Sequence, residues 1–227
     1  MSIIRQRFPY QYSGVAFKLI GINVAVFAAM FLLRGRLPPL FLTFQGYTIP
    51  FPIDRLTGIL SMIPIMVVQG WVWTFITYMF VHGGFAHILF NMFALFMFGV
   101  PVERQMGSRE FLLFYLVTGA LAGIFSFVIY YLTGSIVIML MGASGAVYAV
   151  TLAYAVFYPD AVIYIWGILP LRAPILVLGF TVLSLFSIIT GGGGNVAHLT
   201  HLAGFGFAWL YFLVRFGINP WRRLRMR

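Results

Sequence analysis

Long apolar runs, separated by short clusters of charged residues, glycines and prolines, make up most of the chain. A helix that crosses a lipid bilayer needs about 20 predominantly apolar residues. The interruptions leave six candidate spans, at about residues 15–33, 85–102, 111–132, 144–158, within 171–189, and 196–216. We expect Glu103 and Arg104 to close the second of them. The pattern therefore predicts an all-α polytopic membrane protein with six transmembrane helices.

The segment between the first two spans, residues 37–84, is also apolar but cannot form one straight helix. It contains five prolines, and a proline removes a backbone donor that a helix interior needs: Pro38, Pro39, Pro50, Pro52 and Pro64. The aromatic residues Trp71, Trp73 and Tyr78 follow, and such side chains settle where lipid meets water. We therefore expect a long structured loop that lies in the membrane interface.

The composition agrees with a membrane protein. Hydrophobic residues make up 62% of the chain and charged residues 8%, against about 45–50% and about 25% in ordinary soluble domains. The chain has no cysteine, so disulfides and thiolate metal sites are excluded. Its 227 residues fit a single domain, 1–227, with a short N-terminal segment, about 1–14, and a basic tail, about 217–227.

A net charge of +10 can indicate a nucleic-acid partner, but here the basic residues cluster at the ends of the spans. The positive-inside rule accounts for that arrangement, and we expect no nucleic-acid partner. With the N-terminus in the cytoplasm, 11 of the 14 Lys and Arg residues lie inside; those outside are Arg34, Arg36 and Arg55. The first apolar run lacks a signal-peptidase site and is read as a retained helix. We therefore expect both termini to be cytoplasmic. We also expect an integral protein of a bacterial-type plasma membrane, with its active site opening to the outer face.

A Gly-x-Ser-Gly turn, Gly142-Ala143-Ser144-Gly145, opens the fourth candidate span. Small residues in membrane helices usually serve helix packing, but the same pattern is found where a serine projects from a turn as a nucleophile. The helix from 144 to 158 would be about 22 Å long, against a hydrocarbon core of about 30 Å. Its start would lie below the outer surface, and the connection 134–143 would enter the membrane as irregular backbone. Such backbone requires a protein-lined or water-filled recess.

All four histidines occur in two pairs near the outer face. His87 shares a helix face with Asn91, four residues later, and His198 shares one with His201, three residues later. An ionisable residue inside a membrane is costly and is a functional candidate by default. For His82 and His198 a purely structural role, bonding neighbouring helices, is an equally good interpretation.

The fourth and sixth spans cross the membrane in the same direction, and small residues on both predict how His201 comes close to Ser144. The fourth span carries Gly145, Ala149 and Ala153, and the sixth carries Gly204 and Ala208, so the two helices can pack closely. That packing would bring His201 to Ser144, where its imidazole could accept the hydroxyl proton.

A carboxylate usually orients such a histidine, but the chain has only four acids. Three of them, Glu103, Glu110 and Asp160, map to the cytoplasmic side; the fourth is Asp54. We therefore expect a Ser-His dyad, not a triad. Tyr148 could hold the imidazole ring by stacking, while His87, Asn91 and the Ser144 amide are candidate oxyanion donors.

Four motifs follow one another in order along the chain: His82-x4-His87-x3-Asn91, Glu103-x3-Gly107-Ser108, Gly142-Ala143-Ser144-Gly145-x2-Tyr148 and His201-x2-Gly204. In this combination, over about residues 73–208, the sequence resembles the rhomboid intramembrane serine proteases. Many members of that family carry Trp-Arg in the first outer loop, whereas here Trp73 is followed by Thr74.

The resemblance implies a six-helix core with a water-filled cavity that opens outward, and no cofactor. It implies Ser144 as the nucleophile and His201 as the general base. It also implies that His87 and Asn91, with the amides of Ser144 and Ala143, form an oxyanion hole, that Tyr148 stacks on the base, and that His82 is structural. The expected substrates are membrane-anchored proteins, cut near a transmembrane helix within the lipid bilayer.

Two other classes of membrane protein compete with this interpretation. Four histidines could be axial ligands in a haem or metal protein, but that leaves the Gly-x-Ser-Gly turn unexplained, and metals favour a carboxylate or thiolate nearby. A transporter or a non-proteolytic rhomboid-like chaperone is the other alternative. Such chaperones usually lack the serine or the histidine, and this chain has both Ser144 and His201.

Overall fold

A computed structural model describes residues 13–38, 40–44, 47–50, 54–165, 167–190 and 195–224. The expected N-terminal segment lies almost wholly outside the described residues, as does the end of the basic tail. Within the described part of the chain, four helical stretches are long and apolar enough to cross a membrane: residues 15–33, 85–106, 108–132 and 198–216. Two further apolar helices are shorter. The protein is thus mostly helical and suited to a membrane.

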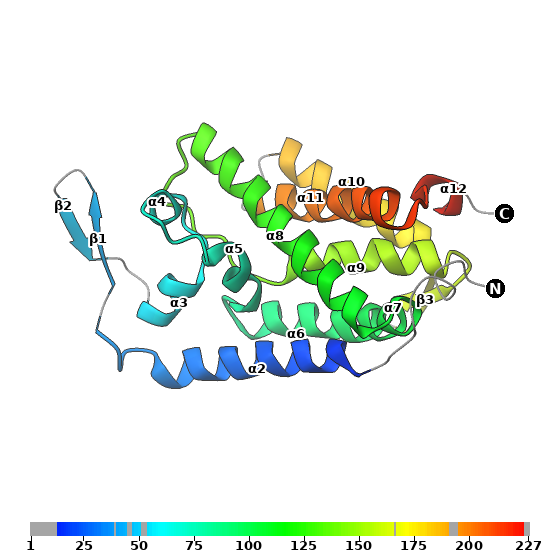
Figure 1. The fold of residues 1–227 in the computed structure, drawn as a ribbon, viewed down its shortest axis with the longest axis horizontal. Coiled ribbons are helices and arrows are strands. Elements are labelled where there is room, and N and C mark those ends of the chain that lie inside the picture. Colours follow the sequence, from blue (N-terminus) through cyan, green and yellow to red (C-terminus); the bar gives the residue numbers. More distant parts are fainter. Residues whose placement is uncertain are drawn as a thin grey trace.

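The main helices begin and end close to the residues that the apolar runs predict. Figure 1 shows α2 (Val15–Leu33) along one side of the molecule. A continuous helical rod follows, made of α6 (Phe85–Ala94), a π-helical turn (Leu95–Gly99) and α7 (Val100–Met106). The remaining helices are α8 (Ser108–Leu132), α9 (Ser144–Phe157), α10 (Ala173–Ile189), α11 (Asn195–Tyr211) with a π-helical extension (Phe212–Phe216), and α12 (Pro220–Leu224).

The proline-rich segment between α2 and α6 folds into short elements. Strands β1 (Phe41–Phe44) and β2 (Tyr47–Pro50) form an antiparallel hairpin in which Phe41 pairs with Pro50. Three short helices and a 3-10 turn follow, namely α3 (Arg55–Leu60), α4 (Pro64–Val68), α5 (Thr74–Thr77) and Tyr78–Phe80. Pro64 stands at the start of α4, where a missing N–H costs nothing.

A second hairpin, which the apolar pattern does not predict, joins α9 to α10. Its strands are β3 (Val162–Ile165) and β4 (Leu169–Arg172), paired antiparallel with Val162 opposite Arg172. The strands have only four residues each and lie between two apolar helices, so their alternation is hidden in the surrounding hydrophobic sequence.

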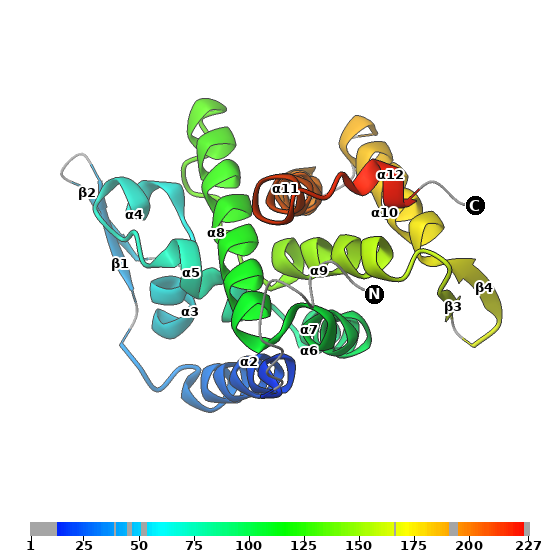
Figure 2. The same cartoon turned by 45° about the vertical axis from the view of Figure 1, so that its right-hand side comes forward.

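Helix α9 lies at the centre of the bundle, with α8, α11, α10 and α7 around it (Figure 2). Small residues make this position possible, because Ala146, Ala149 and Ala153 are fully buried. A Cβ added to Gly119 of α8 would lie 3.1 Å from the Cβ of Ala146, so α8 also approaches α9 closely. Close approach of backbones across small residues is how membrane helices gain packing energy.

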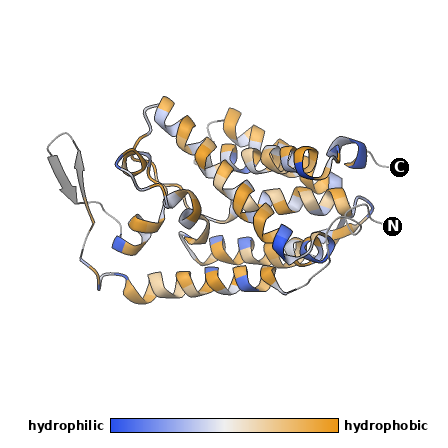
Figure 3. Ribbon diagram, viewed as in Figure 1, coloured by the Kyte–Doolittle hydropathy of each residue, from blue (hydrophilic) through white to orange (hydrophobic). Residues whose placement is uncertain are grey.

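Hydrophilic residues are most frequent at the end of the bundle near the two termini, and most of the length of the long helices is apolar (Figure 3). One acid does not fit the expectation from the sequence. The second rod does not end at Glu103 but continues to Met106, and Gly107, with φ 88°, ends it. The Glu103 carboxylate is fully buried and accepts hydrogen bonds from the backbone N–H groups of Val15 and Ala16, at 2.8 and 2.9 Å. Glu103 therefore caps the N-terminus of α2, where a negative charge is favoured, a role that the sequence alone does not predict.

Candidate active site

The turn before Ser144 has a backbone conformation that glycine favours. Gly142 has φ 120° and its N–H donates to the carbonyl of Tyr78, with an N···O distance of 2.9 Å. Just before it, Leu140 and Met62 exchange two backbone hydrogen bonds of 2.8 and 3.0 Å. The connection 134–143 is thus irregular backbone, tied to the segment that precedes α6. An L side chain at position 142 would be strained in this conformation.

Ser144 is the first residue of α9, and its side chain meets a histidine of α11. The hydroxyl oxygen lies 2.8 Å from Nε2 of His201, within hydrogen-bonding distance. Both side chains are only partly buried. The contact depends on close approach of the two backbones, because a Cβ added to Gly204 would overlap the carbonyl oxygen of Gly145 and lie 3.0 Å from its carbonyl carbon. Small residues on both helices therefore bring the hydroxyl and the imidazole together.

The ring of His201 lies flat against Tyr148, one turn along α9 from the serine. The ring centroids are 4.3 Å apart and the planes are inclined by 17°. Tyr148 also contacts Phe180 of α10 and Phe205 of α11, at centroid distances of 5.5 and 5.0 Å. An aromatic ring held on several sides can fix the plane of the imidazole it covers.

None of the four acids is hydrogen-bonded to His201. Asp54 caps α3 through the N–H of Thr57, Glu103 caps α2, and Glu110 pairs with Arg215. Asp160 is exposed in the turn after α9. Among the described residues Nδ1 of His201 is buried without a hydrogen-bond partner. The arrangement is a serine–histidine pair without an acid.

His87 faces the same turn from the start of α6. A Cβ added to Gly142 would lie 2.7 Å from Nε2 of His87 and 3.8 Å from the hydroxyl oxygen of Ser144. Nδ1 of His87 accepts from the N–H of Gly83 at 3.4 Å. A neutral imidazole that accepts at one nitrogen carries its proton on the other. His87 can therefore present an N–H donor beside Ser144.

His82 and Ala143 form a second contact behind the turn. The N–H of Ala143 donates to Nε2 of His82 at 3.5 Å, so this amide is directed towards His82. The rings of His82 and His87 meet edge to face at 4.9 Å. Burial, with the neighbouring charge of His87 as a smaller cause, lowers the pKa of His82 to about 4. His82 is thus neutral at physiological pH and able to accept.

The two remaining residues that the sequence singles out lie at the edges of this group. Asn91 is buried and donates from its side-chain amide to the carbonyl of His87 at 2.8 Å, one turn back on α6. The ring of His198 lies edge-on to that of His201, with centroids 5.9 Å apart. Within the described residues, no three His, Asp or Glu side chains gather closely enough to hold a metal ion.

Sequence reasoning missed Tyr78 and Thr200, which lie against the turn around Ser144, and Ser126, which is hydrogen-bonded to Thr200. Tyr78 is buried and its hydroxyl donates to the carbonyl of Gly119 at 2.7 Å, and its backbone carbonyl holds Gly142. Ser126 and Thr200 pair with each other across α8 and α11. Hydroxyl residues are common in membrane helices, so only the position of Thr200 beside His201 could have drawn attention to it.

Comparisons with known proteins agree with the resemblance that the sequence motifs indicate. The family model described as Rhomboid domain matches residues 69–218. YdcA, a rhomboid-family protein of Bacillus subtilis, is 30% identical over 178 residues, which cover 78% of this chain and 82% of YdcA. The rhomboid protease GlpG of Haemophilus influenzae is 40% identical over 79 residues, and the rhomboid protease GluP of Bacillus subtilis is 40% identical over 83. These two matches cover 38% of GlpG and 15% of GluP.

Proposed function

Since the chain belongs to the rhomboid family, whose membership implies intramembrane serine protease activity, we propose that it is an endopeptidase acting through Ser144 and His201. Its substrates are membrane-anchored proteins, cut in or near a transmembrane segment. The observation that supports this most is the 2.8 Å distance between the hydroxyl oxygen of Ser144 and Nε2 of His201. A nucleophile and a base within hydrogen-bond reach are the minimum for acyl transfer.

In the first chemical step the Ser144 hydroxyl attacks the carbonyl carbon of the scissile peptide bond, and Nε2 of His201 takes its proton. This requires the tautomer with hydrogen on Nδ1. The imidazolium then gives its proton to the departing amine, which leaves an acyl-enzyme on Ser144. Water, activated by the same nitrogen, releases the second product. Tyr148 supports these transfers by keeping the ring in one plane.

The negative charge on the tetrahedral intermediate needs donors next to Ser144. The backbone N–H of Ser144 is one, because it belongs to the first turn of α9, where N–H groups have no intrahelical partner. Nε2–H of His87 is the second donor that the geometry supports. The Ala143 amide would have to leave His82 to contribute. Asn91 supports the group through the His87 carbonyl.

In the membrane, we propose six spans, with α9 and α10 as the two short ones. The N-terminus and the basic tail face the cytoplasm, and the segment between α2 and α6 lies at the outer interface. Helix α9 has 14 residues, about 21 Å, against a hydrocarbon core of about 30 Å. Ser144 then lies below the outer surface in a wet recess that opens outward.

The test is cleavage of a single-span substrate by the purified protein in detergent and in liposomes. Wild type is expected to cleave and to react with a fluorophosphonate probe at Ser144. Ser144→Ala should lose both activities, and His201→Ala should lose cleavage by at least about 10³-fold. Thr190→Val, at an exposed hydroxyl at the end of α10, is the matched control that should keep both. Full cleavage by either dyad variant would refute the assignment.

A further inference from the structure

A hydrogen bond between two hydroxyl groups lies directly beside the proposed dyad. Oγ of Ser126, on α8, is 2.6 Å from Oγ1 of Thr200, the residue before His201 on α11. Ser126 is fully buried and Thr200 is 2% exposed. The Ser126 hydroxyl also lies 2.8 Å from the carbonyl of Ala122, one turn back on α8. Buried hydroxyls in a membrane helix cannot exchange a lost partner for water, so this pair has a defined geometry.

Three helices meet at Thr200. Its hydroxyl contacts α8, and its methyl carbon would lie 3.3 Å from a Cβ added to Gly145 of α9. The glycine contact between Gly204 and Gly145 sets how closely α11 and α9 approach, but it has no directional group to stop α11 from turning about its axis. A hydrogen bond prefers near-linear geometry. The Ser126–Thr200 bond therefore supplies, directly beside His201, a directional constraint on α11 that the glycine contact lacks.

The rotation of α11 matters because it carries the base. A helix with its side chains has a radius of about 5–6 Å, so a turn of about 10° moves a ring at its surface by about 1 Å. A displacement of that size between reacting groups can reduce a rate by about 100-fold. His201 follows Thr200 directly, so whatever holds Thr200 also holds the ring nitrogen against Ser144.

We propose that Ser126 and Thr200 are positioning residues of the catalytic dyad: their hydrogen bond sets the rotation of α11 and so aligns His201 with Ser144. This inference rests on the proposed proteolytic function. Both residues act through the helix that carries the base, so their effect is on the alignment of His201 and therefore on kcat.

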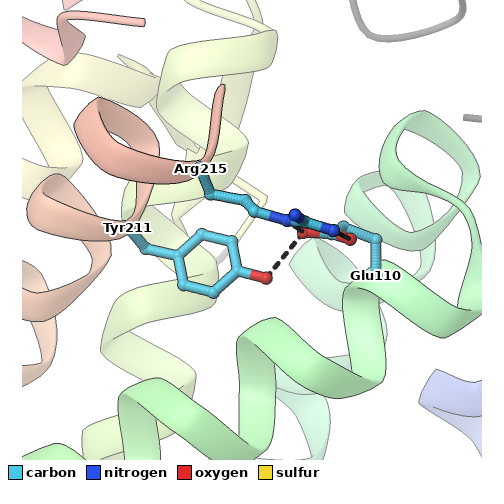
Figure 4. Close-up of polar contacts among 3 residues, drawn as sticks. All are labelled: Glu110, Tyr211 and Arg215. Carbon is cyan, nitrogen blue, oxygen red and sulfur yellow. Dashed lines mark hydrogen bonds and ion pairs between the residues drawn. The ribbon is translucent and has the colours of Figure 1, made fainter. Parts of the chain in front are cut away.

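The far end of the same two helices offers a matched control (Figure 4). There the Tyr211 hydroxyl donates to Oε1 of Glu110 at 2.6 Å, and Arg215 donates to both carboxylate oxygens at 2.9 and 3.1 Å. Tyr211 is 11 residues after Thr200, about 16 Å along α11. Tyr211→Phe thus removes a hydroxyl contact between α8 and α11 at a distance from the dyad.

The experiment compares Thr200→Val, Ser126→Ala, the double variant, Thr200→Ser and Tyr211→Phe with wild type. Measured quantities are kcat and KM for a single-span substrate, the rate of fluorophosphonate reaction at Ser144, and the thermal unfolding midpoint in detergent. We expect Thr200→Val and Ser126→Ala each to lower kcat about tenfold with KM nearly unchanged. The double variant should lose no more than one of the single variants, because both break the same bond.

Thr200→Ser keeps the hydroxyl and should therefore retain most of the wild-type kcat. Tyr211→Phe should lower only the unfolding midpoint. If Thr200→Val does not fold, the smaller change Ser126→Ala decides the question. Unchanged kcat in a folded Ser126→Ala, or a Tyr211→Phe variant that loses as much kcat, would overturn the positioning role while leaving the protease intact. A wild-type protein that neither cleaves nor reacts with the probe overturns the proposed function, and the positioning role with it.

Discussion

At the scale of single residues, the mechanism proposed here requires the imidazole of His201 to become a cation without a carboxylate beside it. The four acids of the chain are committed elsewhere or exposed, and Nδ1 of His201 has no partner in the described part of the structure. The face of Tyr148 lies 4.3 Å from the ring. An aromatic face within about 6 Å attracts a cation, so Tyr148 can both orient the base and stabilise its charged form.

His82 should make the stability of the folded protein depend on pH, and the direction of that dependence follows from the burial of its ring. Its pKa is lowered from an ordinary 6.5 to about 4 in the folded protein, chiefly by burial. At a pH between these two pKa values, His82 is protonated in the unfolded chain but neutral in the folded protein. The free energy of unfolding therefore falls as the pH falls from about 6.5 towards 4. At pH 5 the expected loss is about 1–2 kcal/mol relative to pH 8.

The measurement is thermal or denaturant unfolding in detergent over pH 8 to 4.5. In His82→Asn, which keeps a polar side chain but does not titrate, this part of the pH dependence should disappear. A wild-type curve that is flat across the window, or a His82→Asn curve as steep as wild type, would show that His82 does not hold a neutral ring in the folded state.

At the scale of elements, the close approach of α9 to α11 depends on Gly204 and much less on Gly206. A Cβ on Gly204 would overlap the carbonyl of Gly145, whereas a Cβ on Gly206 meets nothing within 4 Å. We expect Gly204→Ala to force the helices apart, to cost about 1–3 kcal/mol of unfolding free energy and to lower kcat at least about tenfold.

Gly206→Ala is the matched control on the same helix. Because its methyl group enters open space, it should leave cleavage unchanged and leave stability equal or slightly higher. Cleavage kinetics and unfolding midpoints of the two variants check this. Equal behaviour of the two would mean that the contact between Gly204 and Gly145 does not set the distance between the serine and the histidine.

Much of the element order could be predicted from the apolar pattern, and the departures have physical causes. Helix α2 covers the predicted residues Val15–Leu33, and α9 begins at Ser144, because a charge cluster and a glycine turn interrupt the pattern there. The helix of the second span runs to Met106, a few residues past Val102, where the charges of Glu103 and Arg104 set the expected end of the span. The capping role of Glu103 could not be predicted, because a carboxylate that caps another helix looks like a boundary charge in the sequence. The β3–β4 hairpin was missed because its strands are short and as apolar as the helices beside them.

The contact between Ser144 and His201 could be predicted, because small residues recur every four positions beside each of them and let α9 and α11 pack closely. The bond between Ser126 and Thr200 could not, because two hydroxyls 74 positions apart carry no periodic signal. Nor could the hydrogen bond of the Ala143 amide to His82, since local geometry decides where a backbone N–H points. The catalytic roles themselves stay proposals until the variants are measured.

At the scale of the whole molecule, the absence of cysteine makes the proposed orientation directly testable. Single-cysteine variants can be labelled in cells with a membrane-impermeant maleimide. We expect Ser135→Cys, in the connection before α9, to react in intact cells, and Asn219→Cys, before α12, to react only after permeabilisation. Both positions are uncharged, so neither change disturbs the distribution of Lys and Arg that orients the protein. The opposite pattern of labelling would reverse the proposed topology.

In the proposed protease, the backbone hydrogen bonds between the Ser144 turn and the segment before α6 also affect how a substrate could reach the site. Four backbone hydrogen bonds join them: two between Met62 and Leu140, one from Ile65 to Ile136, and one from Gly142 to Tyr78. Separating these two segments would break the four bonds, which together contribute about 2–6 kcal/mol to stability. It would also displace the turn that carries Ser144. If the protein is the protease proposed here, we therefore expect its substrate to approach Ser144 from a side on which these four bonds do not lie.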